Sequence, residues 1–191
     1  VCNAIEIKVG MNGPFSNKYA TVQESEPLPD TTGDNSCIEP MKWCTEGGLQ
    51  HTVWFKFVMP SESGTVSFIT SGLDTQIALY EATACSDILN DNANMIAAND
   101  DYFKRDKNFA AAIMDLDILS KGQTYWLQMD GGAGGVEGEF KIEVKESAVG
   151  MSDPSSNKES IQVYPNPSSG QFNIVFKNKK YRNVQLEIFN I

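Results

Sequence analysis

The chain has 191 residues, which is enough for one complete domain and part of a second. Hydrophobic residues make up 41% of the sequence, as in ordinary globular proteins, and no apolar run reaches the roughly 20 residues of a membrane-spanning helix. The net charge of -10 opposes binding to nucleic acid and to anionic lipid, and it favours cations as ligands.

Charge and composition divide the chain into three parts. The first 146 residues include 22 acidic and 10 basic residues, whereas the rest of the chain includes 3 acidic and 5 basic residues. Between the two modules, residues 147–159 are poor in apolar side chains and have no periodicity, as is typical of a linker. We therefore expect an acidic domain over 1–146, a linker over 147–159 and a second module over 160–191.

Alternating apolar and polar residues predict strands with one buried face along the first domain. Less regular strands are expected at 18–23, 94–99 and 109–117, and one helical turn at 84–89. Turn-forming stretches such as SESG, NDDY and GGAGG separate these segments, at the spacing of antiparallel sheets. We predict an all-β fold: an antiparallel, jelly-roll-like β-sandwich, followed by a partial small β-sandwich at the C-terminus. The clearest strands cover residues 4–9, 52–58, 64–70, 75–81, 123–129 and 138–145.

Residues 27–48 lack strand periodicity and are long for a loop. Long loops are usually functional or cross-linked. The loop contains Trp43, which either stacks on a sugar as a ligand-binding residue or caps the edge of the sandwich. Capping is the favoured alternative, because tryptophan is usually largely buried.

The four cysteines are even in number and include no CxxC pair, and His51 is the only histidine. A zinc site is therefore disfavoured. We expect two disulfides, Cys37 with Cys44 and Cys2 with Cys85, in an exported protein whose signal peptide was removed or lies outside this sequence. The alternative is four free cysteines in a cytosolic protein.

Motifs for catalysis are absent from the sequence. GxSxG and HExxH do not occur, and His51 precedes a predicted strand with no nucleophile motif to serve, so we expect it to be structural. The glycine-rich stretch GGAGGVEG leads into a strand instead of a helix, and so does not predict a phosphate site. Asp115 and Asp117 share one face of a strand, but carboxylates on an acidic surface are usually solvated. We predict no catalytic residue.

Near the end of the chain, IQVYPNPSSGQFNIVF (161–176) predicts a hairpin. Its two prolines cannot donate to a β-ladder, so the first strand must stop before them, and Gly170 lets the chain enter the next strand. With the following VQLEIFNI, the segment resembles the C-terminal sorting domain of the bacterial type IX secretion system. The motif residues are Tyr164, Pro165, Asn166, Pro167, Gly170, Phe172 and Ile174.

This resemblance covers roughly the last thirty residues, and it implies a small β-sandwich that the type IX secretion machinery recognises. It implies a secreted or cell-surface protein that passes through the periplasm. Because the sequence ends at Ile191, before the later strands of that family, we expect only the first part of the sorting domain here.

The first domain carries, in order, Trp54–Phe55, Asp74–Thr75, Leu79–Tyr80, Asn99–Asp101 and Gly138 before Phe140. With these features it resembles the bacterial pre-peptidase C-terminal type of β-sandwich over about residues 2–146. Such domains are non-catalytic accessory modules of secreted proteases, other hydrolases and adhesins, and several bind calcium or polysaccharide and protein surfaces. The resemblance implies an accessory module; the alternatives are a hydrolase or lyase domain with an unrecognised site, or a structural adhesin module.

Four oxygen-bearing residues lie in predicted turns at strand ends: Asp74, Asn99, Asp100 and Asp101. Oxygen ligands gathered by loops are what Ca²⁺ requires. Aspartate and asparagine also build solvated turns that bind nothing. The resemblance adds weight to calcium, and we expect these four residues to be its ligands.

Overall fold

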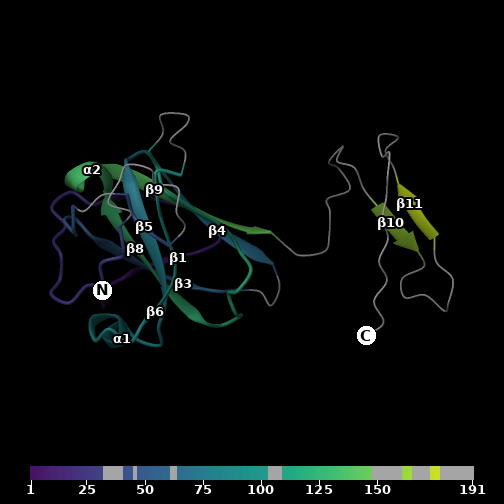
Figure 1. Cartoon of the computed structure of the whole chain (residues 1–191), viewed down its shortest axis with the longest axis horizontal. Coiled ribbons are helices and arrows are strands. Elements are labelled where there is room, and N and C mark those ends of the chain that lie inside the picture. The colour runs from purple at the N-terminus through teal and green to yellow at the C-terminus, as the bar shows by residue number, and fades with distance from the viewer. Residues whose placement is uncertain are drawn as a thin grey trace. The chain divides into compact units, whose positions relative to one another are not determined.

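The computed structural model divides into two compact units, Val1–Val149 and Gly150–Ile191 (Figure 1). Among the described residues, no helix is long and apolar enough to cross a membrane. The segment 161–164 and the segment 173–176 are described as backbone only. The structure describes residues 1–31, 41–44, 47–60, 64–102, 109–147, 161–164 and 173–176.

The first unit consists of two β-sheets and two short helices (Figure 1). In chain order its elements are β1 (Ile5–Ile7), β2 (Gly10–Ser16), β3 (Val53–Val58), β4 (Thr65–Ser71), β5 (Thr75–Glu81), α1 (Cys85–Leu89), β6 (Asn94–Asp100), β7 (Ala112–Leu116), β8 (Thr124–Gly131), α2 (Gly132–Gly135) and β9 (Glu139–Ser147).

The five-stranded sheet has the order β1-β3-β8-β5-β6, and the four-stranded sheet has the order β2-β9-β4-β7. Neighbouring strands in the described residues are antiparallel except β1, which runs parallel to β3. Without β1, the two orders are those of a jelly roll, in which the chain passes repeatedly between two four-stranded sheets and only β5 and β6 follow each other in one sheet. This confirms the predicted all-β, jelly-roll-like sandwich.

All but one of the predicted strands are found, with shifts of at most three residues at their ends and none for 75–81. The strand predicted at 18–23 is wrong, since this segment has no regular structure and Tyr19 has a positive φ of 65°. The prediction missed β2, whose Gly13 and Pro14 argue against a strand. β2 tolerates Pro14 because it is an edge strand, and its register with β9 shifts between Asn12 and Phe15. The GGAGG turn contains the short helix α2.

The prediction of one buried face fails for the centre of the five-stranded sheet. In β5 every residue from Thr75 to Tyr80 is buried, and in β8 every residue from Tyr125 to Gly131 is buried. One face packs against the four-stranded sheet, as an edge-to-face contact between Phe57 and Phe68 illustrates, with ring centroids 5.3 Å apart. The other, called the outer face here, is covered by irregular segments and α1, which alternation alone does not reveal.

A second apolar cluster fills the outer face. It contains Trp43, Trp54, Tyr80, Ile88 and Trp126. Trp43 is only 1% exposed, and its Nε1–H donates to the carbonyl oxygen of Ile77 at 3.0 Å. Its ring therefore presents no face on which a sugar can stack, and the structure corrects its assignment as a ligand-binding residue. The alternative of an apolar cap on the sheet describes its position.

The irregular cover is held on the sheet by buried polar side chains. Asp130 in β8 is fully buried, and its two carboxylate oxygens accept hydrogen bonds from the backbone N–H groups of Gln50, His51 and Gly131 at 2.7–2.9 Å. Such bonds compensate a buried carboxylate for the water it has lost. Gln128 in the same strand donates through Nε2 to the carbonyl oxygen of Pro27 at 3.0 Å.

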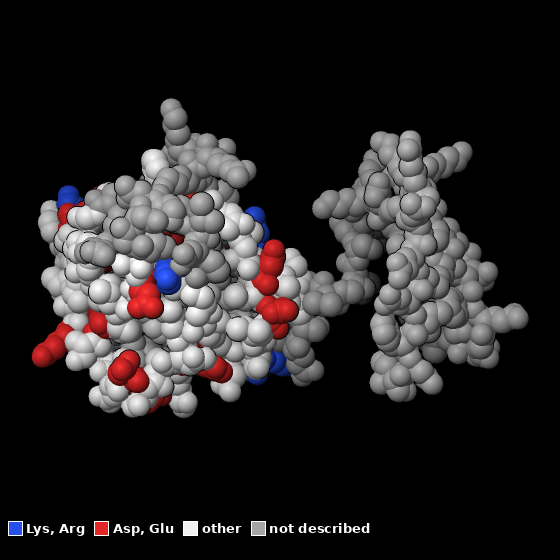
Figure 2. Space-filling view, viewed as in Figure 1, with Lys and Arg blue, Asp and Glu red and all other residues white. Residues whose placement is uncertain are grey.

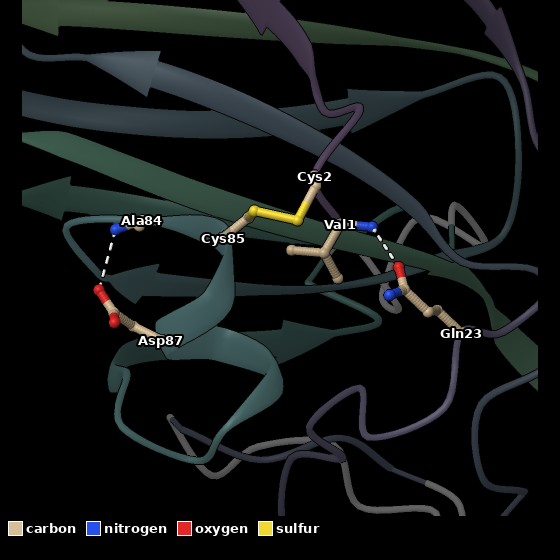
Figure 3. Close-up of a disulfide and its surroundings, with 6 residues drawn as sticks. All are labelled: Val1, Cys2, Gln23, Ala84, Cys85 and Asp87. Atoms are coloured by element: carbon tan, nitrogen blue, oxygen red, sulfur yellow. Dashed lines mark hydrogen bonds between the residues drawn. A yellow bond between two sulfur atoms is a disulfide. The ribbon is translucent and has the colours of Figure 1, made fainter.

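A disulfide joins Cys2, just before β1, to Cys85 at the start of α1 (Figure 3). This confirms one of the two predicted pairs. Cys44 is also disulfide-bonded. The remaining cysteine, Cys37, lies outside the described residues. Beside the bridge, Asp87 accepts a hydrogen bond from the N–H of Ala84 and so closes the first turn of α1 (Figure 3).

In the second unit, β10 (Ile161–Tyr164) and β11 (Asn173–Phe176) form an antiparallel pair with Tyr164 opposite Asn173. The first strand ends immediately before the two prolines, as the hairpin prediction requires. Tyr164 and Ile174 lie in these strands. The other motif residues, Pro165, Asn166, Pro167, Gly170 and Phe172, lie outside the described residues, as does most of the linker.

We predict that Asp130→Asn lowers the free energy of unfolding by about 2–4 kcal/mol, because an amide nitrogen would face backbone N–H donors in a buried site. Urea denaturation measures the change. Asp117→Asn is the matched control, since Asp117 is exposed and the same charge is lost; it should change stability by about 0.5 kcal/mol or less. Equal stabilities of the two variants would contradict this role of Asp130.

Candidate metal centre

Three carboxylates gather at one end of the five-stranded sheet: Asp74 before β5, Asp100 at the end of β6, and Asp101 after it. We call them the acidic cluster. Asp101 has φ of 46°, in the left-handed region that aspartate tolerates better than most residues. Its carboxylate, that of Asp100 and the sulfur of Cys44 have ligand atoms within 4.8 Å of one another. Because Cys44 is disulfide-bonded, its sulfur offers no thiolate, and the ligands here are oxygens.

The three carboxylates repel one another, and Asp100 among them is buried. Burial is the main cause that raises the pKa of Asp100 to about 7, and the negative charges of Asp101 and Asp74 raise it further. The backbone N–H of Cys44 donates to Asp100 Oδ2 at 3.1 Å, which opposes the shift. Burial and the charge of Asp101 also raise the pKa of Asp74 to about 6. The cluster therefore concentrates negative charge at this end of the sheet.

Two oxygens, one within the acidic cluster and one on the neighbouring residue Gln76, are buried without a hydrogen bond in the part of the chain that the structure describes: Asp74 Oδ1 and Gln76 Oε1. Gln76 is 4% exposed and lies directly opposite Asp100 across the β5–β6 ladder. Side chains opposite each other in an antiparallel pair lie on the same face, with Cβ atoms about 4.5–5.5 Å apart. Gln76 therefore brings an amide oxygen to the carboxylates.

The structure does not bring Asn99 into the acidic cluster. Successive side chains of a strand point to opposite faces, so Asn99 faces away from Asp100. Its Oδ1 accepts a hydrogen bond from the backbone N–H of Ala112 at 3.0 Å. Because Ala112 begins β7, this bond ties β6 to the other sheet. The position of Asn99 corrects its assignment as a metal ligand.

The glycine-rich turn also has a role that its sequence did not suggest. A Cβ atom on Gly132 would overlap Asp74 Oδ1, and one on Gly131 would overlap the carbonyl oxygen of Val136. The N–H of Gly132 donates to the carbonyl oxygen of Asp74 at 3.1 Å. Glycine is needed here so that the turn can approach Asp74 closely.

Sequence reasoning missed Gln76 at this site. The strand pattern places Gln76 between Thr75 and Ile77 as an ordinary polar position facing solvent. Gln76 follows Asp74 by two positions, and side chains two positions apart in extended chain lie on the same side. This spacing is the signal in the sequence that points to Gln76 as a neighbour of Asp74. That signal becomes informative only once both faces of β5 are known to be buried.

The exposed surface of the first unit is acidic as well. Figure 2 shows aspartate and glutamate side chains distributed over the visible face, with few lysines or arginines among the coloured residues. An acidic surface attracts cations over several ångströms and raises their local concentration.

Comparison with known proteins identifies the C-terminal part of the chain. Residues 162–191 match the family described as the secretion system C-terminal sorting domain. Searches of curated proteins and of solved structures found no match. The matching segment indicates export through the type IX secretion system to the cell surface or outside the cell. The resemblance of the first unit to the pre-peptidase C-terminal sandwich stays a prediction.

We predict that, in the presence of a chelator, the free energy of unfolding falls as the pH rises from 5 to 7. The folded-state pKa values of Asp74 and Asp100, about 6 and 7, lie above the ordinary value of 3.8, so the folded state holds protons that the unfolded state has lost. Urea denaturation at four pH values measures the slope. Asp100→Asn should flatten it, and a wild-type stability that is constant or rises over this range would contradict the assignment.

Proposed function

We propose that residues 1–147 form a calcium-binding, non-catalytic accessory module of a larger secreted or cell-surface protein. The main support for this proposal is that the acidic cluster lies next to Gln76, whose Oε1 is buried without a hydrogen-bond donor among the described residues. Carboxylate and amide oxygens are what Ca²⁺ binds, and a divalent cation would offset the burial and the repulsion that raise both pKa values. The type IX sorting segment supports a location at the cell surface or outside the cell. Calcium-binding modules are common in extracellular proteins.

The oxygens of the acidic cluster fit calcium better than a transition metal. Ca²⁺ takes six to eight hard oxygen ligands in flexible geometry, partly from water. Asp74, Asp100 and Asp101 supply carboxylates, and Gln76 supplies a neutral oxygen. Zinc and copper prefer nitrogen or thiolate ligands. His51, the only histidine, contributes its Nδ1–H to the carbonyl oxygen of Ala20 at 2.9 Å, in a different part of the outer face.

A second candidate function follows from the same pKa values. A carboxyl group with a pKa near 7 suits a general acid or base, as in hydrolases and lyases. Asp100, however, is only 4% exposed and its Oδ2 already accepts a hydrogen bond from Cys44. A catalytic group must reach a substrate, whereas a metal ligand is commonly buried in this way. The observations therefore favour calcium over catalysis.

Calcium should raise the melting temperature of the protein, because it binds the folded state preferentially. At a concentration about 100 times the Kd the stabilisation is about 2.7 kcal/mol, or roughly 5–10 °C for a domain of this size. Thermal melts in millimolar calcium and in EGTA measure the difference at pH 7.5.

Asp100→Asn separates metal binding from a purely structural role. The variant keeps an oxygen for the N–H of Cys44 but removes one buried negative charge, so it should melt higher than the wild type in EGTA and respond less to calcium. Asp117→Asn should keep the full calcium response. Superimposable wild-type curves in calcium and EGTA would overturn the metal proposal.

The sorting segment gives a separate prediction. Replacing residues 162–191 with a glycine and serine linker of equal length should leave the protein in the periplasm of a type IX secreting host, because the segment recognised by the machinery is lost. Fractionation and immunoblotting locate the protein. A replacement confined to residues 148–159 is the control and should still be exported. Export of the first variant at the control's level would contradict the assignment.

A further inference from the structure

The side chain of Asn12 holds the connection between the two sheets. β1 belongs to the five-stranded sheet and β2 to the four-stranded sheet, and the chain crosses between them just before Gly10. Asn12 Oδ1 accepts a hydrogen bond from the N–H of Lys8 at 3.0 Å, and its Nδ2 donates to the carbonyl oxygen of Lys8 at 2.8 Å. Nδ2 also donates to the carbonyl oxygens of Gly10 at 3.0 Å and of Ile142 in β9 at 3.3 Å. One amide group therefore joins the crossover to the neighbouring strand.

These contacts require an amide at position 12. Three carbonyl oxygens surround Nδ2, and a carbonyl oxygen accepts hydrogen bonds but cannot donate them. Aspartate has nearly the same shape, but it would place a charged oxygen where Nδ2 now donates. The geometry at this position therefore specifies asparagine.

The next position requires glycine for a different reason. Gly13 has φ of 107°, a conformation that residues with a side chain rarely adopt. A Cβ atom there would lie 3.1 Å from the nitrogen of Phe15 and 3.2 Å from the carbonyl oxygen of Phe140. The fold thus specifies the dipeptide Asn12–Gly13, which is the one Asn-Gly pair in the sequence.

An asparagine before a glycine is chemically labile, because glycine has no side chain to shield its nitrogen from the asparagine amide. The nitrogen of Gly13 attacks Asn12 Cγ. The N–Cγ bond forms, the Cγ–Nδ2 bond breaks, and Nδ2 leaves as ammonia with the proton of the Gly13 N–H. Water then opens the cyclic imide at either of its carbonyl groups, which gives aspartate or isoaspartate. The net reaction consumes one water and releases one ammonia, and it needs no oxidant or reductant.

The β2–β9 ladder leaves the reacting groups accessible. The register shifts between Asn12 and Phe15, so Gly13 and Pro14 have no partner residue in β9. Residues at such a shift are released from the regular ladder. Gly13 is exposed and Asn12 is partly exposed, so water reaches this part of the edge strand.

We propose that Asn12 is a site of spontaneous deamidation, and that its modification releases the connection between the two sheets. The change is one-way, because the ammonia is lost to solvent. The proposal goes beyond the accessory role given above and does not depend on the acidic cluster.

Both products lose the contacts of the amide. Aspartate places a negative charge against the carbonyl oxygens of Lys8, Gly10 and Ile142. Isoaspartate also adds one methylene to the backbone of β2, so the residues before it lose their pairing with Val144 and Glu143 of β9. The domain should therefore lose stability as the product accumulates.

Peptide mapping by mass spectrometry tests the reaction. The 191-residue chain is incubated at pH 8 and 37 °C, and aspartate and isoaspartate are measured at each asparagine. Asn12 should convert before Asn92 and Asn94, which are exposed but precede alanine and methionine. Conversion should be slower at pH 6, because the attacking nitrogen must lose its proton. An Asn12 that stays intact, or that converts no faster than Asn94, would overturn the proposal.

Asn12→Asp reproduces one product directly. It should lower the melting temperature by about 4–10 °C, because the donor is lost and a charge faces carbonyl oxygens. Asn94→Asp is the matched control, since it makes the same change at an exposed position, and it should shift the melting temperature by about 2 °C or less. Equal melting temperatures of the two variants would show that the amide does not hold the connection.

The aged wild-type chain supplies the same measurement if Asn12→Asp does not fold. Anion exchange separates the deamidated fraction, which carries one more negative charge, from the unmodified fraction. The deamidated fraction should melt lower, and trypsin should cleave it faster after Lys8, whose carbonyl oxygen has lost its donor. Equal melting and equal cleavage of the two fractions would contradict the proposed release.

Discussion

The structure depends on one constraint: the central strands of the five-stranded sheet are buried on both faces, but the jelly roll supplies a partner sheet for only one. The outer face must be covered by segments without regular structure, whose backbone N–H and C=O groups still need partners. The sheet itself provides them from buried polar side chains, chiefly Asp130, Gln128 and Asp100. Apolar packing thus covers the outer face, and a few hydrogen bonds determine where each covering segment lies.

The candidate metal site occurs where this cover leaves hydrogen-bonding groups unsatisfied. At one end of β5 and β6, Asp74 Oδ1 and Gln76 Oε1 lack a donor among the described residues, and Asp100 lies directly opposite Gln76. The proposed cation would compensate oxygens that the cover itself does not.

The sequence predicted the sheets well because alternation and turns are local signals. It predicted the strand that ends at Tyr164 for the same reason. The Cys2–Cys85 bridge spans 83 residues, so no local signal specifies this pair, and its prediction rested on the even number of cysteines. It did not predict β2, where Pro14 opposes local propensity but an edge position tolerates it. It assigned Asn99 to calcium, left sugar stacking open for Trp43 beside the favoured capping role, and overlooked Gln76. The direction of those side chains depends on the cover over the outer face, and contacts between distant segments determine that cover.

The bridge between Cys2 and Cys85 encloses the first five strands in a closed ring of chain. Such bonds form in oxidising compartments and are rare in the cytoplasm. Once the bridge has formed, the segment before β1 is joined covalently to α1 on the outer face. The redox state of the compartment therefore determines whether this part of the cover is covalently fixed.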